Sequence, residues 1–158
     1  MGYGPIHLGM SRSQIEKLYG EKLDRFSDYQ ESCLEYRPRG GYPIAGITFI
    51  LNRDRLARID FNKMTVSHGP PDAVVDVESY TGVRIGDPAE KIETIYGKAA
   101  IKTAGRGRHA GEVLYTIAST DKRNLIRYFV GLSGTVGSFR VGRRHEVLNV
   151  DHCRGSNE

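Results

Sequence analysis

The sequence predicts an α+β protein of two tandem repeats, each a helix followed by an antiparallel meander, which together form one sheet backed by helices. Residues 6–20 recur without a gap at residues 83–97, and strand-like segments at hairpin spacing follow both copies. The identical positions of the two copies are Gly9/Gly86, Ile15/Ile92, Glu16/Glu93, Tyr19/Tyr96 and Gly20/Gly97. We expect a first repeat at 1–62, a connector at 63–80, a second repeat at 81–153 and a polar tail at 154–158.

Each copy of the repeated stretch encodes a short capped helix. In the first copy Ser11 and Gln14 form a capping box, and in the second Asp87 is the expected N-cap before Pro88 and Glu90. Apolar residues at i, i+3 and i+4 give each helix one buried stripe, and the glycine that follows suits a left-handed C-terminal cap. This pattern predicts a structural role for the repeat, because such stripes usually pack a core.

The remaining segments read as strands and turns. Residues 21–31 are polar, and we expect a loop or a second short helix there. Strands are expected at 33–36, 47–51, 56–61, 112–118, 124–130 and 135–141. In the third of these strands Ile59 and Phe61 alternate with Arg58 and Asp60, so the apolar pair should face the core and the charged pair the solvent.

Composition sets wide limits on function. The 158 residues are 39% hydrophobic and 27% charged, which is enough for a sizeable core. The net charge of +4 is compatible with an acidic protein partner, an anionic envelope surface or nucleic acid, and requires none of them. The sequence has no apolar run of transmembrane length and no signal peptide. It enters the repeat almost directly, which fits either a native start or a removed leader.

The two cysteines, Cys33 and Cys153, lie one in each half of the chain. They can form a disulfide or remain two free thiols, and neither has the spacing of a metal ligand. A disulfide would tie the last segment to the first repeat. Chain-entropy arguments give such a long loop a stabilisation of about 4 kcal/mol.

A search for catalytic motifs finds none. The five histidines form no zinc-binding pair, and Ser133 lies in Gly-Leu-Ser-Gly-Thr, which fails the nucleophile-elbow pattern at Thr135. Glu16 and Glu93 are duplicated, which favours a structural role in each repeat over a single active site. We therefore expect a protein that is not an enzyme and that binds no metal or cofactor.

Two basic clusters, at residues 105–109 and 140–145, are candidates for contact with a partner. The segment 105–109 is either a solvated loop or a flexible basic finger that enters an acidic cleft. If the two sheets join, Arg58, Arg127 and Arg140 should share the solvent face, near Tyr128, and this face is either a binding surface or an ordinary solvated face. The predicted interface comprises Arg58, Arg106, Arg108, His109, Arg127, Tyr128 and Arg140.

The repeat also resembles a known group of proteins. Its helix begins at Gly-Met-Ser (9–11) or Gly-Asp-Pro (86–88), ends at Tyr-Gly, and precedes a meander of three or four strands. This is similar to the tandem repeat of the beta-lactamase inhibitor protein family and to the single unit of small outer-membrane assembly lipoproteins. The resemblance covers about 4–62 and 81–153. The sequence carries no lipobox cysteine at its start, and an inhibitor's interface loops find no match residue by residue.

The resemblance implies a protein exported by bacteria, without catalytic activity, and it favours a Cys33–Cys153 disulfide like that of some relatives. We expect a periplasmic or secreted protein-binding module that inhibits or neutralises an enzyme with an acidic cleft, as an inhibitor or immunity protein does. The alternative is a component of cell-envelope assembly or a scaffold. Neither hypothesis requires nucleic acid or a membrane span.

Overall fold

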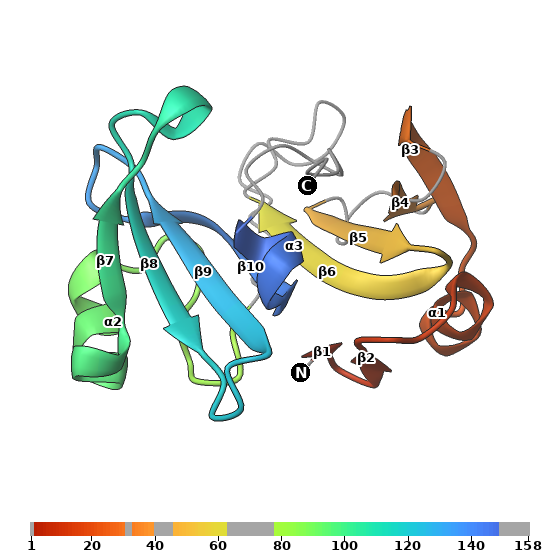
Figure 1. Ribbon diagram of the computed structural model, residues 1–158, viewed down its shortest axis with the longest axis horizontal. Helices are drawn as coiled ribbons and strands as arrows, with labels where there is room; N and C mark the ends of the chain where they lie inside the picture. Colours follow the sequence, from red (N-terminus) through yellow and green to blue (C-terminus); the bar gives the residue numbers. More distant parts are fainter. Residues whose placement is uncertain (1, 31–32, 40–45, 63–77, 149–158) are drawn as a thin grey trace.

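The computed structural model describes residues 2–30, 33–39, 46–62 and 78–148. A single antiparallel sheet of eight strands dominates this part of the chain. The strands are β3 (Leu23–Gln30), β4 (Cys33–Pro38), β5 (Ile47–Asn52), β6 (Arg55–Asn62), β7 (Ile101–Ala104), β8 (Val113–Ala118), β9 (Asn124–Val130) and β10 (Val136–Arg143). Their order across the sheet is β3-β4-β5-β6-β10-β9-β8-β7. The sheet twists strongly, so that β7–β9 run nearly across the direction of β5 and β6 (Figure 1).

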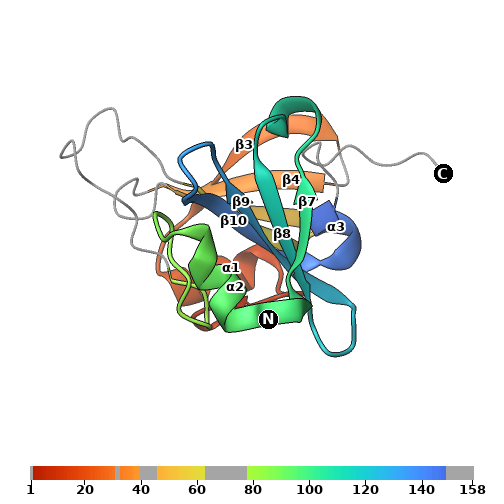
Figure 2. The ribbon, with the colours of Figure 1, turned by 90° about the vertical axis from the view of Figure 1, so that its left-hand side faces the viewer.

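The helical elements are short. They are α1 (Arg12–Tyr19), α2 (Ala89–Tyr96), α3 (Arg144–Leu148) and the 3₁₀ turns η1 (Gly97–Ala99) and η2 (Gly107–His109). A separate ribbon pairs β1 (Gly2–Tyr3) with β2 (Ile6–His7). Helices α1 and α2 each bury a single isoleucine in the core, Ile15 and Ile92. Figure 2 shows α1 and α2 at the lower side of the molecule and α3 apart from them.

The predicted α+β class is therefore wrong, because the protein is mainly β. Residues 21–31, expected as a loop or helix, contain β3, and β7 was not predicted. Both are edge strands. In β7 every side chain is exposed, and at the start of β3 Leu23 is buried while the next three residues are exposed. Such strands lack the alternation of apolar residues that reveals a half-buried strand, so their polar composition resembles that of a loop.

The two halves of the chain occupy the two halves of the sheet. Strands β6 and β10 meet at its centre in antiparallel register, with Asp60 opposite Arg140 and Phe61 opposite Phe139. The strand order on one side of this pair mirrors the order on the other, which gives the sheet an approximate two-fold axis between Asp60 and Arg140. Connector residues 63–77 and the tail lie outside the described residues.

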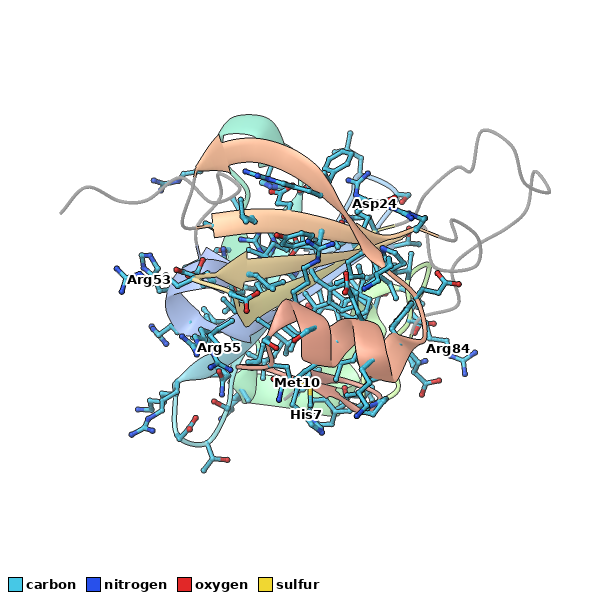
Figure 3. All side chains as sticks on the ribbon, turned by 90° about the vertical axis from the view of Figure 1, so that its right-hand side faces the viewer. His7, Met10, Asp24, Arg53, Arg55 and Arg84 are labelled. Carbon is cyan, nitrogen blue, oxygen red and sulfur yellow. The ribbon has the colours of Figure 1, made fainter. Side chains whose placement is uncertain are left out.

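The repeated glycine has the same structural role in both halves. Gly9 and Gly86 have positive φ values of 92° and 95°, which favour glycine. The Gly9 N–H donates to the carbonyl of Leu56 (2.8 Å), and the Gly86 N–H donates to that of Val136 (2.7 Å). Each glycine therefore docks the turn before its helix onto a central strand. In Figure 3, Met10 and Arg55 lie close together where the first turn meets β6.

The capping prediction is correct for α1 and wrong for α2, where the N-cap lies one residue later and Gly97 (φ 50°, ψ −129°) does not adopt the predicted left-handed cap. Ser11 and Gln14 form the predicted box, and Gly20 adopts the left-handed conformation. The N-cap of α2 is Pro88, which provides no side-chain cap. The Asp87 carboxylate instead accepts a bond of 2.6 Å from the N–H of Arg84, a local side-chain to backbone contact that competes with helix capping.

The repeated glutamate ties each helix to the strands that follow it. Glu16 Oε1 accepts the N–H of Leu23 at 3.0 Å, and Glu93 Oε1 accepts the hydroxyl of Tyr115 at 2.6 Å and Lys102 Nζ at 3.1 Å. The bond from Leu23 lowers the pKa of Glu16 below its ordinary 4.5, and the nearby cations lower it further. These contacts give the duplicated glutamate a structural role.

We expect acid to destabilise the protein partly through Glu16. Because its pKa is lower in the folded than in the unfolded chain, the ionised carboxylate stabilises the fold above the unfolded-state pKa. That contribution is lost as the pH falls through the folded-state pKa. Urea unfolding from about pH 6 to pH 3 should show a shallower loss of unfolding free energy in Glu16→Gln than in the wild type. Glu90→Gln, on the exposed side of α2, should keep the wild-type slope, and equal slopes for all three proteins would contradict this role.

Candidate functional site

A row of polar side chains crosses the sheet on the face opposite the main hydrophobic core. Strand register aligns its members in the order Asp24, Arg37, Thr48, Asp60, Arg140, Arg127 and Thr116, from β3 to β8. The row is exposed at Asp24, which Figure 3 shows at the edge of the molecule, and is closed at its centre, where Asp60 and Arg140 are 5% and 7% exposed. Its centre is therefore an internal polar network.

Asp60 holds this network together. Both of its oxygens accept bonds from the Arg58 guanidinium, at 2.8 and 3.0 Å, and Arg140 Nε lies 3.8 Å from the carboxylate. Arg140 also lies over the Phe129 ring, 4.6 Å from its centroid. Arg58 is 1% exposed and donates a further bond of 2.7 Å to the carbonyl of Glu146 in α3.

Arg58 and Arg140 are thus not on an open surface, and the prediction that they face the solvent is wrong. The physical reason is α3, which the sequence pattern did not indicate. It folds against β6, β9 and β10 and accepts a hydrogen bond from Arg58. Alternation along a strand identifies which residues share a face, but it does not show whether another element covers that face.

Tyr128 and Arg127 point to opposite faces of the sheet, so they cannot form one patch. Tyr128 is fully buried in the core, and its hydroxyl shares a hydrogen bond of 3.0 Å with that of Tyr96. Burial raises the pKa of Tyr128 well above its ordinary value. Arg127 is half-buried on the polar face and donates to Thr116 Oγ1 at 2.9 Å, and burial lowers the pKa of its guanidinium.

The segment 105–109 forms an ordered loop rather than a free finger. Gly105 donates to the carbonyl of Glu112 at 2.8 Å, and η2 fills the loop. The His109 ring packs against Phe129 with centroids 4.7 Å apart, its Nδ1 pairs with Glu112, and its buried Nε2 has no hydrogen-bond partner among the described residues. Arg106 is exposed, and the side chain of Arg108 lies outside the described part. His109 therefore supports the loop from inside.

A different set of cations does gather at the surface. The turn between β8 and β9 carries Lys122 and Arg123, and the junction of β10 with α3 carries Arg143 and Arg144. Arg144 donates its N–H to the carbonyl of Arg123 (2.8 Å), which brings the two segments together. Figure 3 shows Arg53 pointing outward from the turn between β5 and β6, on the side that carries α3. We call Arg53, Lys122, Arg123, Arg143 and Arg144 the α3 cationic surface.

These five side chains are exposed, and none forms an ion pair with a described carboxylate. Asp54 and Asp121 lie in the same turns and leave the surface with an excess of positive charge. Arg53 and Lys122 also have left-handed backbone conformations, with φ of 49° and 58°. Glycine or asparagine is favoured there, so a long cationic side chain is kept at some cost in backbone strain.

The basic run at residues 140–145 contained the signal for this surface. Strand alternation directed the prediction to Arg140, which proves to be buried, and away from Arg143 and Arg144 at the end of the strand. The contribution of Lys122 and Arg123 depends on the pairing of β9 with β10, which brings the distant turn next to α3. No pattern within either segment indicates that contact.

Cys33 begins β4 and is buried beside Ile50 on the polar face of the sheet. Cys153 lies outside the described residues, so the predicted disulfide between them stays a prediction. Within the described ranges no cluster of three or more histidine, cysteine, aspartate or glutamate side chains is placed to hold a metal ion. No helix in those ranges is long and apolar enough to cross a membrane.

Comparison with known proteins adds no relative: the chain matches no protein-family model, no curated protein and no solved structure. The resemblance to inhibitor and envelope-assembly repeats therefore stays a prediction.

Proposed function

We propose that the protein is a non-catalytic binding module that engages an acidic face of a protein partner through the α3 cationic surface. The observation that carries the proposal is the gathering of five exposed cations, from two turns and the junction of β10 with α3, without ion-pair partners among the described residues. Side chains in such an arrangement are free to pair with carboxylates of another molecule. The partner we propose is an exported enzyme with an acidic cleft, which the module inhibits or neutralises in the periplasm or outside the cell.

The rigidity of this surface supports the proposal. Arg143 and Arg144 follow a central strand, and the buried contact between Arg58 and Glu146 holds α3 in place. The turn that carries Lys122 is fixed by the Ser119 hydroxyl, which bonds to Asp121 Oδ1 at 2.6 Å. Cations on a preorganised scaffold lose little conformational entropy at the backbone when they bind. They also accelerate encounter with an acidic partner, which makes association sensitive to salt.

Charge reversal provides the test. The double variant Arg143→Glu/Arg144→Glu should weaken binding of the partner by about tenfold to a hundredfold, with much of the loss in the association rate. The partner is first captured from envelope and secreted fractions of the source organism, and the purified pair is then measured by surface plasmon resonance at several salt concentrations. We expect an acidic protein bound with one-to-one stoichiometry and a wild-type affinity that falls with salt.

A matched control separates this surface from the loop predicted from the sequence. Lys98→Glu/Arg106→Glu changes the net charge equally but alters exposed positions at η1 and the 105–109 loop. It should bind the partner as the wild type does. Equal weakening of both double variants would contradict a specific α3 surface. If the protein binds mixed-sequence duplex DNA tightly and this binding falls steeply with salt, the partner of the surface is nucleic acid and not a protein.

A further inference from the structure

A cleft opens on the core face of the sheet, where the two halves of the chain meet. Its volume is about 560 Å³, within the range of small-molecule sites. Phe61 and Phe139 form its floor, with rings stacked at a centroid distance of 4.6 Å, and Ile126 and Val141 continue the apolar surface. The cleft thus lies beside the approximate two-fold axis of the sheet.

The cleft exists because α1 and α2 fill the flanks of the core face and not its centre. Ile15 and Ile92 anchor the helices, and Figure 1 places α1 and α2 at opposite ends of the molecule. Near the axis the walls come from small elements: Gly2 of β1, residues 78–80 and the turn after β8. These segments border the stacked rings without filling the space above them. A space of this size with an apolar floor favours a ligand with a compact apolar body.

The rim of the cleft carries negative charge. Asp121 and Glu78 line it together with the polar side chains of Thr120 and Asn124. The Ser119 hydroxyl donates to Asp121 Oδ1, as does the N–H of Arg123 at 3.0 Å, and these bonds lower the pKa of Asp121, so the carboxylate is ionised at neutral pH.

The charge of Glu78 is already balanced, because Arg84 donates to its Oε2 from both Nε and Nη2. Asp121 has no ion-pair partner within 4 Å among the described residues, and no described lysine or arginine lines the cleft. The rim therefore offers one carboxylate that forms no direct ion pair with a described residue, beside an apolar floor, although the charge of nearby Arg123 also lowers its pKa. A cation is the complementary group, since a charge-assisted hydrogen bond to a carboxylate is among the stronger polar contacts.

We propose that this cleft binds a small organic cation: an amine with an aromatic or branched apolar body. The apolar body would cover Ile126 and the stacked rings of Phe61 and Phe139, and the ammonium group would donate to the Asp121 carboxylate at the rim. This site is separate from the α3 cationic surface and does not depend on the function proposed for it. The two sites flank the same turn, with Asp121 facing the cleft and Lys122 and Arg123 at the surface.

The test uses three probes of similar shape: 2-phenylethylamine, the neutral 2-phenylethanol and the anionic 3-phenylpropanoate. Each is titrated into the ¹⁵N-labelled full chain while amide shifts are followed by NMR. We expect the amine to shift residues 78–80, 119–126 and 139–141 and to bind at least about tenfold more tightly than the alcohol. The carboxylate should bind more weakly than both. Absence of these shifts up to about 10 mM amine, or equal affinity for amine and alcohol, would overturn the proposal.

Three variants locate the site. Asp121→Asn should remove the preference for the amine, and Asp54→Asn, a carboxylate in another hairpin turn, should leave it intact. Thr120→Trp places a large ring at the exposed rim and should weaken all three probes without lowering the unfolding temperature. Unchanged amine binding in both Asp121→Asn and Thr120→Trp would show that the amine binds elsewhere.

Discussion

Gly142→Ala is expected to lower the free energy of unfolding by about 3 kcal/mol or more. A Cβ at this position would lie 2.5 Å from the carbonyl oxygen of Ala57 and 2.7 Å from the Cα of Arg58. Both atoms belong to the backbone of the neighbouring central strand, so they cannot turn away as a side chain end can. Gly142 leaves the space in which the buried Arg58 crosses β10 toward α3. Urea unfolding followed by circular dichroism measures the loss.

Gly137→Ala is the matched control, because Gly137 lies in the same strand. A Cβ there would meet nothing closer than the carbonyl oxygen of Phe129 at 3.8 Å, an ordinary contact distance. This variant should keep the wild-type stability within about 0.5 kcal/mol. Equal stability of Gly142→Ala and Gly137→Ala would show that β6 and β10 can separate at Gly142 without penalty, and would contradict the close packing of Arg58.

Asp60→Asn is expected to lower the free energy of unfolding by about 3–5 kcal/mol. Among the described residues, the change removes the one carboxylate in direct ion pairing with buried Arg58, and it replaces the carboxylate near Arg140 with a neutral amide. A buried guanidinium keeps its desolvation penalty in this variant, and it loses the attraction to the carboxylate that had offset this penalty. The same denaturant titration measures the effect, and a broadened transition would report loosening at the centre of the sheet.

Two further variants test whether the lost counter-charge is the cause. Asp24→Asn removes a carboxylate of the same polar row, but its ion pair with Arg39 is exposed, so the expected loss of stability is far smaller than in Asp60→Asn. Arg58→Met/Asp60→Leu replaces the buried pair with apolar groups and should recover much of the stability lost in Asp60→Asn. If the double variant is as unstable as the single one, packing rather than charge accounts for the loss.

The buried network also affects the proposed function. Arg58 connects the centre of the sheet to α3, the element that presents Arg144 and follows Arg143. Asn52 supports the same helix, because its side-chain amide donates to Glu146 Oε1 at 3.0 Å. Loss of these contacts should loosen α3 and reduce partner binding without a change in surface charge. A destabilised Asp60→Asn protein that still folds should therefore bind its partner more weakly, although the substitution removes a buried negative charge and leaves the exposed cations unchanged.

The sequence by itself determined the repeated local features of this protein. Two copies of one stretch predicted α1 and α2, and Gly9 and Gly86 proved to make equivalent contacts. The repeated glutamates differ, because Glu16 accepts the backbone N–H of Leu23 and Glu93 accepts the hydroxyl of Tyr115. The helices, the capping box of α1 and the positive φ of the two glycines depend on residues close in sequence. Local conformational preferences are sufficient to specify them.

Only the tertiary structure decided which charged residues reach the surface. In β6 every residue from Leu56 to Phe61 is buried, so both faces of the strand are covered and alternation does not distinguish core from solvent. The five-residue helix α3 buries Arg58, and the pairing of β9 with β10 places Arg123 beside Arg144. The edge strands β3 and β7 likewise owe their conformation to the strands they pair with rather than to an apolar pattern of their own. These outcomes depend on contacts between residues distant in sequence, which no local pattern encodes.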